Sequence, residues 1–212
     1  APGPCPGEAF VIPVTVYPGI QVPNQSGSVC SGENFTLNLV DNPPEVILPD
    51  GVTFTWSAAD SPNVTNEQPG TAESVFSQTL FLDEDVFAQT VQFDVDVVAG
   101  AGCEGASFAV ELFVHDLDPG LIQGAQSLCV GEEPQPISFS ANPIGGGSVT
   151  QQWQFFDPVQ GSWIDILGAT SLSYLPPSDL TETTLFRAEV RSTAGGSSCP
   201  KTTNEIEVEI RN

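Results

Sequence analysis

Three landmarks recur along this chain at a spacing of about 98 residues, and no other feature limits the possible folds as strongly. Each half contains a Cys-x-Gly-Glu turn followed by an alternating segment, then a Trp, then a Cys ahead of the last apolar segment. The matched pairs are Cys30 with Cys129, Trp56 with Trp153, and Cys103 with Cys199, at offsets of 99, 97 and 96 residues. Three independent offsets near one value predict two modules with the same architecture.

The modules themselves are predicted to be β-sandwiches. The 20 Gly and 19 Pro residues, with frequent Val, Thr and Phe, favour short strands joined by turns. Apolar and polar residues alternate in several segments, as in half-buried antiparallel strands. The residues expected to face the cores are Val91, Phe93, Val95, Val97, Phe108, Val110, Leu112 and Val114 in the first module, and Phe186, Ala188, Val190, Ile206, Val208 and Ile210 in the second. This pattern, with one Trp on the third strand of each module, is typical of an immunoglobulin-like sandwich.

An extra strand is predicted ahead of the two modules. Subtracting the period from Cys103 leads to Cys5, and an apolar alternation follows at Phe10, Ile12, Val14 and Val16. We interpret this stretch as the last strand of a preceding repeat. The expected organisation is residues 1–18 as an orphan strand and linker, residues 19–117 as the first sandwich, and residues 118–212 as the second.

The orphan strand needs a host, because a single strand leaves its backbone edges and its apolar face uncovered. If the chain is part of a longer array, the host is an upstream repeat. If the chain is a mature subunit, the strand can complete a sandwich in a neighbouring molecule by β-strand addition and so link subunits into a fibre. The longer array is favoured, because both repeats already possess their own last strands.

The sequence leaves two alternatives for the disulfides. Five Cys without Cys-x-x-Cys or Cys/His clusters are typical of disulfide formation in an oxidising compartment. Repeat symmetry favours one bridge in each module, Cys30 with Cys103 and Cys129 with Cys199. However, these positions fall at opposite ends of an ordinary sandwich, so the alternative is a bridge from Cys30 to Cys199 that staples one module to the next. Cys5 has no evident partner and is expected to be unpaired, or to bridge to another repeat or another molecule.

The distribution of charge excludes two classes of partner. The net charge is −23, and all four basic residues lie in the second repeat. Such a surface repels phosphate backbones and anionic lipids, so nucleic-acid binding and peripheral membrane attachment are not expected. Membrane insertion is not expected either, because no run of apolar residues approaches the roughly 20 needed to span a bilayer. The high negative charge suits a secreted protein in an extracellular or outer-surface location. Arg187 and Arg191 are expected to pair across strands with the acidic row formed by Glu205, Glu207 and Glu209.

Few residues offer chemistry. His115 is the only histidine, and without a second His or a Ser/His/Asp set it is expected to be an exposed linker residue of a protein with no enzymatic activity. Asp116 and Asp118 lie at the joint between the modules, where calcium could gather oxygen ligands and stiffen the chain. The alternative is that these carboxylates are simply solvated. No other cofactor is expected.

Aromatic residues suggest one binding surface. Trp56 and Trp153 occupy the core position of their strands and are expected to be buried. Phe156 and Trp163 would form a platform for a surface glycan if they share an exposed face. Ordinary packing within a hairpin is the alternative for both residues.

The second repeat resembles a known group of modules. The segments SLCVGEE, QQWQFFDPVQGSWIDILGATSLSYLPPSDLTETTLFRAEV and SSCPKTTNEIEVEI resemble immunoglobulin-like and PKD-like modules of large secreted Bacteroidota surface proteins, including gliding-motility adhesins. The first repeat, with CSGENFTLNLV and VTFTWSA, is similar to a more divergent PKD-like member. The resemblance implies tandem immunoglobulin-like/PKD-like β-sandwiches, an outer-surface location and export by the type IX route. It carries over no catalytic residue.

Together these features predict a non-enzymatic extracellular structural or adhesive repeat protein that forms part of a cell-surface stalk, fibre or giant adhesin. Its partners would be neighbouring repeats or identical subunits, with surface glycans as a further class to test. The alternative is a carbohydrate-binding accessory module of a secreted enzyme.

Overall fold

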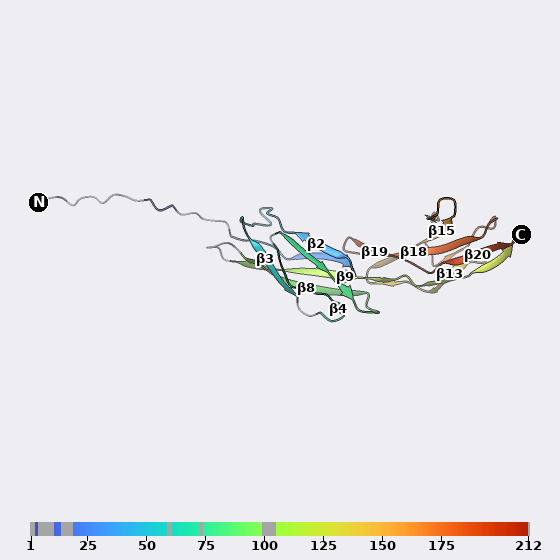
Figure 1. Ribbon diagram of the computed structural model, residues 1–212, viewed down its shortest axis with the longest axis horizontal. Coiled ribbons are helices and arrows are strands. Elements are labelled where there is room, and N and C mark those ends of the chain that lie inside the picture. Colours follow the sequence, from blue (N-terminus) through green and yellow to red (C-terminus); the bar gives the residue numbers. More distant parts are fainter. Residues whose placement is uncertain are drawn as a thin grey trace.

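The computed structural model describes residue 3 and residues 11–13, 19–58, 61–72, 74–98 and 105–211. Every regular element in these residues is a β-strand, so the predicted all-β class is confirmed. The strands form two modules that lie end to end along the long axis of the molecule (Figure 1). We call strands β1–β9 the first module and strands β10–β20 the second module. No helix in the described ranges is long and apolar enough to cross a lipid bilayer.

The first module is built on a five-stranded sheet with the order β1-β9-β8-β3-β5. Strand β1 runs parallel to β9, and the other neighbours are antiparallel. Two short ladders, β2-β6 and β4-β7, complete the sandwich. The bounds are β1 Gln25–Cys30, β2 Asn34–Asn38, β3 Thr53–Ala58, β4 Val64–Thr65, β5 Gly70–Ala72, β6 Val75–Thr79, β7 Phe81–Leu82, β8 Ala88–Val98 and β9 Ala106–His115.

The second module repeats this plan with one change. Its main sheet has the order β12-β20-β18-β15-β16, with β12 parallel to β20, and β11-β13-β17 forms the facing sheet. The last strand is split, because β19 pairs with the end of β18 and β20 pairs with its beginning. The bounds are β10 Leu117–Asp118, β11 Leu121–Gln123, β12 Gln126–Cys129, β13 Ile137–Ala141, β14 Ile144–Gly145, β15 Ser148–Asp157, β16 Ser162–Asp165, β17 Ser173–Tyr174, β18 Thr184–Ala194, β19 Ser197–Thr202 and β20 Ile206–Arg211.

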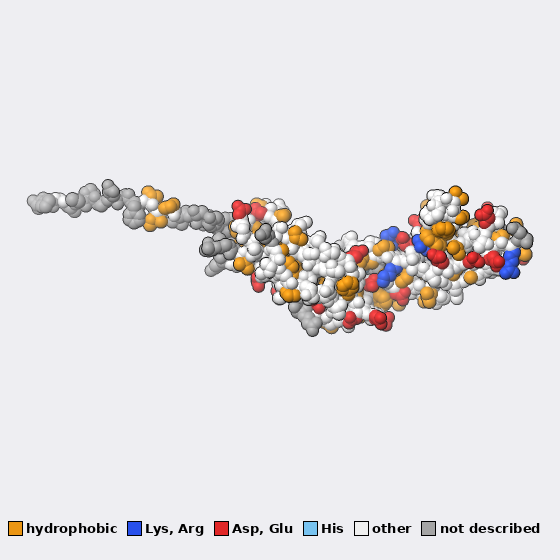
Figure 2. Space-filling model, in the orientation of Figure 1, with side chains coloured by type: hydrophobic (Ala, Val, Ile, Leu, Met, Phe, Trp, Pro, Cys, Tyr) orange, Lys and Arg blue, Asp and Glu red, His pale blue; other side chains and the backbone are white. Residues whose placement is uncertain are grey.

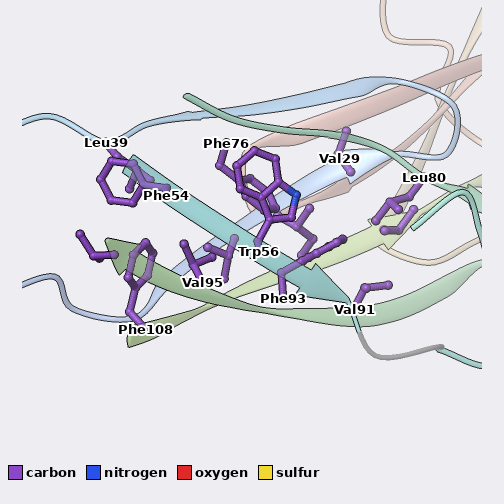
Figure 3. Close-up of a cluster of buried hydrophobic side chains, with 14 of the residues drawn as sticks. Val29, Leu39, Phe54, Trp56, Phe76, Leu80, Val91, Phe93, Val95 and Phe108 are labelled. Atoms are coloured by element: carbon purple, nitrogen blue, oxygen red, sulfur yellow. The ribbon is translucent and has the colours of Figure 1, made fainter. Parts of the chain in front are cut away.

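The core of the first module is aromatic at its centre (Figure 3). The Phe76 ring lies 5.0 Å from Trp56 and 5.2 Å from Phe93, measured between ring centroids, so β6 packs directly over β3 and β8. The inward rows predicted on β8 and β9 are confirmed, since all eight residues are buried. Burial of Trp56 is confirmed as well, and its indole N–H donates to the Gln68 carbonyl at 3.2 Å.

The core of the second module is arranged around Trp153, which is fully buried as predicted. Its ring contacts Phe139 from the facing sheet at 5.6 Å and Tyr174 at 6.1 Å. Its indole N–H donates to the Ser171 carbonyl at 2.8 Å, so the polar end of the ring is satisfied inside the sandwich. The predicted inward residues of β18 and β20 belong to this core or pack against it.

The predicted orphan strand falls mostly outside the described residues. Ile12 is described, is 68% exposed and lies in no strand, whereas Phe10, Val14 and Val16 are outside the description. Cys5 is outside it too. The assembly role of this segment therefore stays a prediction.

Replacing Phe93 by Ala should destabilise the first module by about 3–5 kcal/mol, because it removes a fully buried ring and leaves a cavity. Amide hydrogen exchange should report this as faster exchange in β8 and β9 than in β18. The matched control is Phe81→Ala, whose ring is 46% exposed and whose loss should change exchange little. Equal effects of the two substitutions would contradict the packing described above.

Candidate functional site at the module junction

The two modules meet without a free linker. Strand β9 ends at His115, and β10 begins two residues later at Leu117, which is already buried in the second core. The hairpin formed by β18 and β19 reaches back toward the end of β1, in the middle of the molecule (Figure 1). The junction is therefore a packed contact between two folded modules.

A disulfide joins Cys30 at the end of β1 to Cys199 in β19, with a Cα–Cα distance of 5.6 Å. The favoured prediction of one bridge inside each module is therefore wrong for both residues, and the structure contains the alternative staple. The Cys30–Cys199 pairing follows from the position of Cys30. It pairs with His115 at the end of the first module that faces the second. Cys129, the repeat equivalent of Cys30, is exposed and unbonded, and Cys103 lies outside the described residues.

His115 is fully buried beside this disulfide, so its predicted exposure is wrong. Its ring lies 3.4 Å from the Cys199 sulfur and stacks on Phe113 at 5.8 Å. Nε2 is 2.6 Å from the Ser197 hydroxyl, and Nδ1 is 3.2 Å from the Ser192 hydroxyl. The side chain points to the outer face of its own sheet, where the second module covers it.

A neutral imidazole satisfies this network. The Ser197 hydroxyl donates to the Ala194 carbonyl at 2.9 Å, and the Ser28 hydroxyl is 2.7 Å away. We therefore assign the imidazole proton to Nε2, which donates to Ser197, while Nδ1 accepts from Ser192. Desolvation lowers the pKa of His115, against the weaker pull of the Asp116 and Glu33 carboxylates. A ring this deeply buried binds the modules together and has no access to a substrate.

Two glycines allow the modules to approach this closely. A Cβ on Gly146 would lie 1.9 Å from the Phe87 carbonyl oxygen, and a Cβ on Gly195 would lie 2.6 Å from the Ser28 Cβ. Gly146 instead donates its N–H to the Asp116 carbonyl at 3.1 Å. The second module thus contacts the first from both sides of the linker.

The carboxylates at the joint are engaged by the protein itself. Asp116 accepts from the Lys201 ammonium at 2.9 Å, and Asp118 accepts from the Gly120 N–H at 2.9 Å. A groove of about 380 Å³ brings these residues near the acidic turn 83–85. In the part of the chain that the structure describes, one group of three potential metal ligands has its ligand atoms within 4.8 Å of one another: Cys30, His115 and Cys199. The two cysteines of this group already form the disulfide. Calcium at Asp116 and Asp118 stays a prediction.

Phe156 and Trp163 do share one face, at paired positions of β15 and β16. Their rings meet edge to face at 5.5 Å, and both are half-buried. The Arg187 guanidinium lies 4.1 Å above the Trp163 ring and donates to Gln154 at 2.9 Å. One face of the Trp163 ring is therefore occupied by a cation from the same module.

Arg187 and Arg191 have partners outside the predicted acidic row. Arg191 pairs with Glu189 on its own strand, and Arg211 pairs with Glu209. In the described ranges, no ion pair joins Arg187 or Arg191 to the acidic row on and before β20. Stacking on an aromatic ring and a charged neighbour on the same strand replace the expected cross-strand ladder. All four basic residues nevertheless lie on the second module, and some are visible near the junction (Figure 2).

Sequence reasoning missed the polar half of the junction. Ser28, Ser192, Ser197 and Lys201 were not singled out, because serines and a lysine in strands carry no motif. The available signal was Cys30, which a sandwich fold places at the end of its module. Its nearness to His115 comes from the pairing of β1 with β9 and cannot be read from the sequence.

Two family profiles match the chain, one for each module. Residues 27–117 match a family described as "PKD-like domain", and residues 118–212 match a family described as "Domain of unknown function (DUF8696)". No protein with a curated description matches the chain. The matches support immunoglobulin-like and PKD-like repeat modules, as the resemblance implied.

Solved structures of several consecutive domains align with the chain. The three N-terminal domains of the Highly Immunogenic Outer Capsid protein (Hoc) of bacteriophage RB49 align with a TM-score of 0.50 and 13% identity, over 89% of this chain and 68% of that one. The FN1-FN3 domains of chicken CNTN1 align with a TM-score of 0.42 and 13% identity, over 93% and 70%. The titin fragment I67-I69 aligns with a TM-score of 0.40 and 11% identity, over 90% of this chain and 64% of that one. At 13% identity, the alignment with the Hoc domains shows a shared fold and nothing further.

The burial of His115 predicts a pH-dependent junction. Because the pKa of His115 is lower in the folded protein than in the unfolded chain, the unfolded chain binds more protons below pH about 6.5. Stability should therefore be complete above that pH and should decline as pH falls below it. Thermal unfolding between pH 5 and 8 should show a steeper loss for the natural chain than for His115→Gln, which can still form hydrogen bonds but cannot titrate. Parallel curves would contradict the assignment.

Proposed function

We propose that this chain is part of a non-enzymatic extracellular array, a stalk or fibre in which consecutive modules are locked into a fixed relative orientation. Tandem immunoglobulin-like and PKD-like domains are typical of extracellular structural and adhesive proteins. The observation that carries the proposal is the disulfide from Cys30 to Cys199, which joins two modules that each have their own core. Disulfides of this kind persist in oxidising, extracellular surroundings.

The contacts around the disulfide support a stiff joint. The buried imidazole, three serine hydroxyls and the Lys201–Asp116 ion pair all cross from one module to the other or to the linker. Interfaces between domains usually permit relative motion unless they are extensive and well packed. The disulfide, beside a polar network in which each group has a hydrogen-bond partner, prevents the two modules from moving relative to each other. Such rigidity suits a stalk that holds the far end of a protein away from the cell surface.

The charge of the chain suits an exposed fibre. A net charge of −23 on 212 residues keeps neighbouring copies apart along their sides. Contacts between modules are then favoured at their ends, where the staple is found.

Carbohydrate binding in the service of a secreted enzyme is the competing function. The Phe156 and Trp163 pair supports it only in part, since Arg187 covers one ring face. A glycan array separates the two functions. Saturable binding that is lost in Trp163→Ala would favour the accessory module, and no binding agrees with a stalk.

Replacing Cys199 by Ser should unlock the joint. We expect the free energy of unfolding to fall by about 2–4 kcal/mol, because the cross-link no longer restricts the unfolded chain. In the natural chain, the residual dipolar couplings of the two modules should fit one alignment tensor. In the Cys199→Ser variant, we expect the two modules to require two tensors of unequal magnitude. The couplings report orientation directly.

Cys129→Ser is the matched control, because it makes the same chemical change at a cysteine that forms no bond. It should leave the single tensor intact. Two unequal tensors already in the natural chain would show that the joint is not rigid and would remove the basis of the proposal.

A further inference from the structure

The far end of the second module reproduces the backbone that holds the staple in the first. Cys129 pairs in parallel register with Arg211, as Cys30 pairs with His115. The N–H of Glu132 donates to the Cys129 carbonyl at 3.0 Å, and Glu33 makes the same bond to Cys30 at 3.0 Å. The two turns are alike in backbone as well as in sequence.

The correspondence continues on either side of the cysteine. The residue after it donates its N–H to the last residue of the paired strand in both modules, at 2.9 Å for Ser31 and His115 and at 3.3 Å for Val130 and Arg211. The glycine of each turn has a positive φ, +81° for Gly32 and +87° for Gly131. The two ends therefore offer a cysteine in the same local setting.

The two cysteines differ in whether another module covers them. Cys30 is buried beneath the β18–β19 hairpin of the next module, whereas Cys129 is exposed and forms no disulfide. Val130, the next residue, is 54% exposed. The position that a following module occupies on the first module is open on the second.

Apolar surface lies at the same end. A groove of about 470 Å³ is lined by Phe155, Tyr174, Leu180 and Thr183, among others. The Thr183 hydroxyl accepts from the N–H of Ile210, which precedes the strand partner of Cys129, so the groove and the cysteine belong to one end face. A docked module would cover both.

We propose that Cys129 is the attachment site for a cysteine in the last hairpin of a further immunoglobulin-like module, held against this end as Cys199 is held against Cys30. This inference rests on the proposed array of modules, and it identifies the disulfide that would join the second module to the module after it. The partner must place a thiol three residues past a tight hairpin, as Cys199 follows Gly196. Cys103 and Cys5 hold that place in the sequence repeat, and their structure is outside the description.

The bond forms by thiol–disulfide exchange. The Cys129 thiolate attacks a small disulfide such as oxidised glutathione, which gives a mixed disulfide and one released thiolate. The hairpin thiolate then attacks the Cys129 sulfur and releases the second thiolate. One S–S bond forms in the protein and one is reduced in the oxidant, so two electrons pass to the oxidant and the two thiol protons go to the released thiolates.

The test extends the chain after Arg211 by a second copy of residues 116–211, so that Asp116 and Leu117 again form the joint, in a glutathione redox buffer. We expect peptide mapping without reduction to recover Cys129 linked to the hairpin cysteine of the added module. Maleimide labelling of Cys129 should be lost, and the yield should not depend on protein concentration, because the two thiols are in one molecule.

The matched control moves the thiol. In Cys129→Ser with Ser171→Cys, an exposed cysteine lies on the side of the second module, and we expect no link to the added hairpin. If the moved thiol links equally well, or if Cys129 of the extended chain stays free, the proposal is overturned.

The natural chain alone provides a second arm that does not depend on the added module. Covalent multimers in which Cys129 joins Cys103 or Cys5 of another copy would support the site and show that a second copy can fill it. Multimers joined only through Cys129 to Cys129 would overturn it. Neither result alters the orientation of the two natural modules, so the proposed function is tested separately.

Discussion

The side chains of Cys30, His115 and Cys199 are buried between the ends of β1, β9 and β19, and the arrangement of the two modules depends on that burial. The His115 ring fills this space, in contact with the disulfide on one side and with serine hydroxyls at both ring nitrogens. A buried polar ring is costly unless each nitrogen has a partner, and these partners come mainly from the second module. Displacing the module would leave the imidazole unsatisfied, so the polar network selects one docking geometry and the disulfide retains it.

The interior of each module could be read from the sequence because it depends on local alternation. The rows on β8, β9 and β18 have the period of a half-buried strand, and each lies where that period places it. Trp56 and Trp153 followed from the same reasoning. These features depend on a residue and its neighbours two positions away, which a single sequence contains.

The junction could not be read in the same way. His115 follows Val114, an inward residue, so the alternation assigns it to the outer face, where its ring stacks on Phe113. Its burial comes from residues about 80 positions later, and nothing local signals them. The favoured disulfide pairing was wrong for a related reason. Repeat symmetry describes what each module contains, but it does not indicate which end of a module contacts the next module. Only the position of Cys30 at the end of its module hinted at the staple.

The length of chain enclosed by the staple has a mechanical consequence. Cys30 and Cys199 are separated by 169 residues, which include most of both cores. Tension applied along the long axis passes from β1 through the disulfide into β19 and β20, so the enclosed segment carries little of the load. Without the bond, unravelling that segment could release on the order of 600 Å of extended chain. With it, both sandwiches can lose their hydrogen bonds under load while the distance spanned by the tether barely changes.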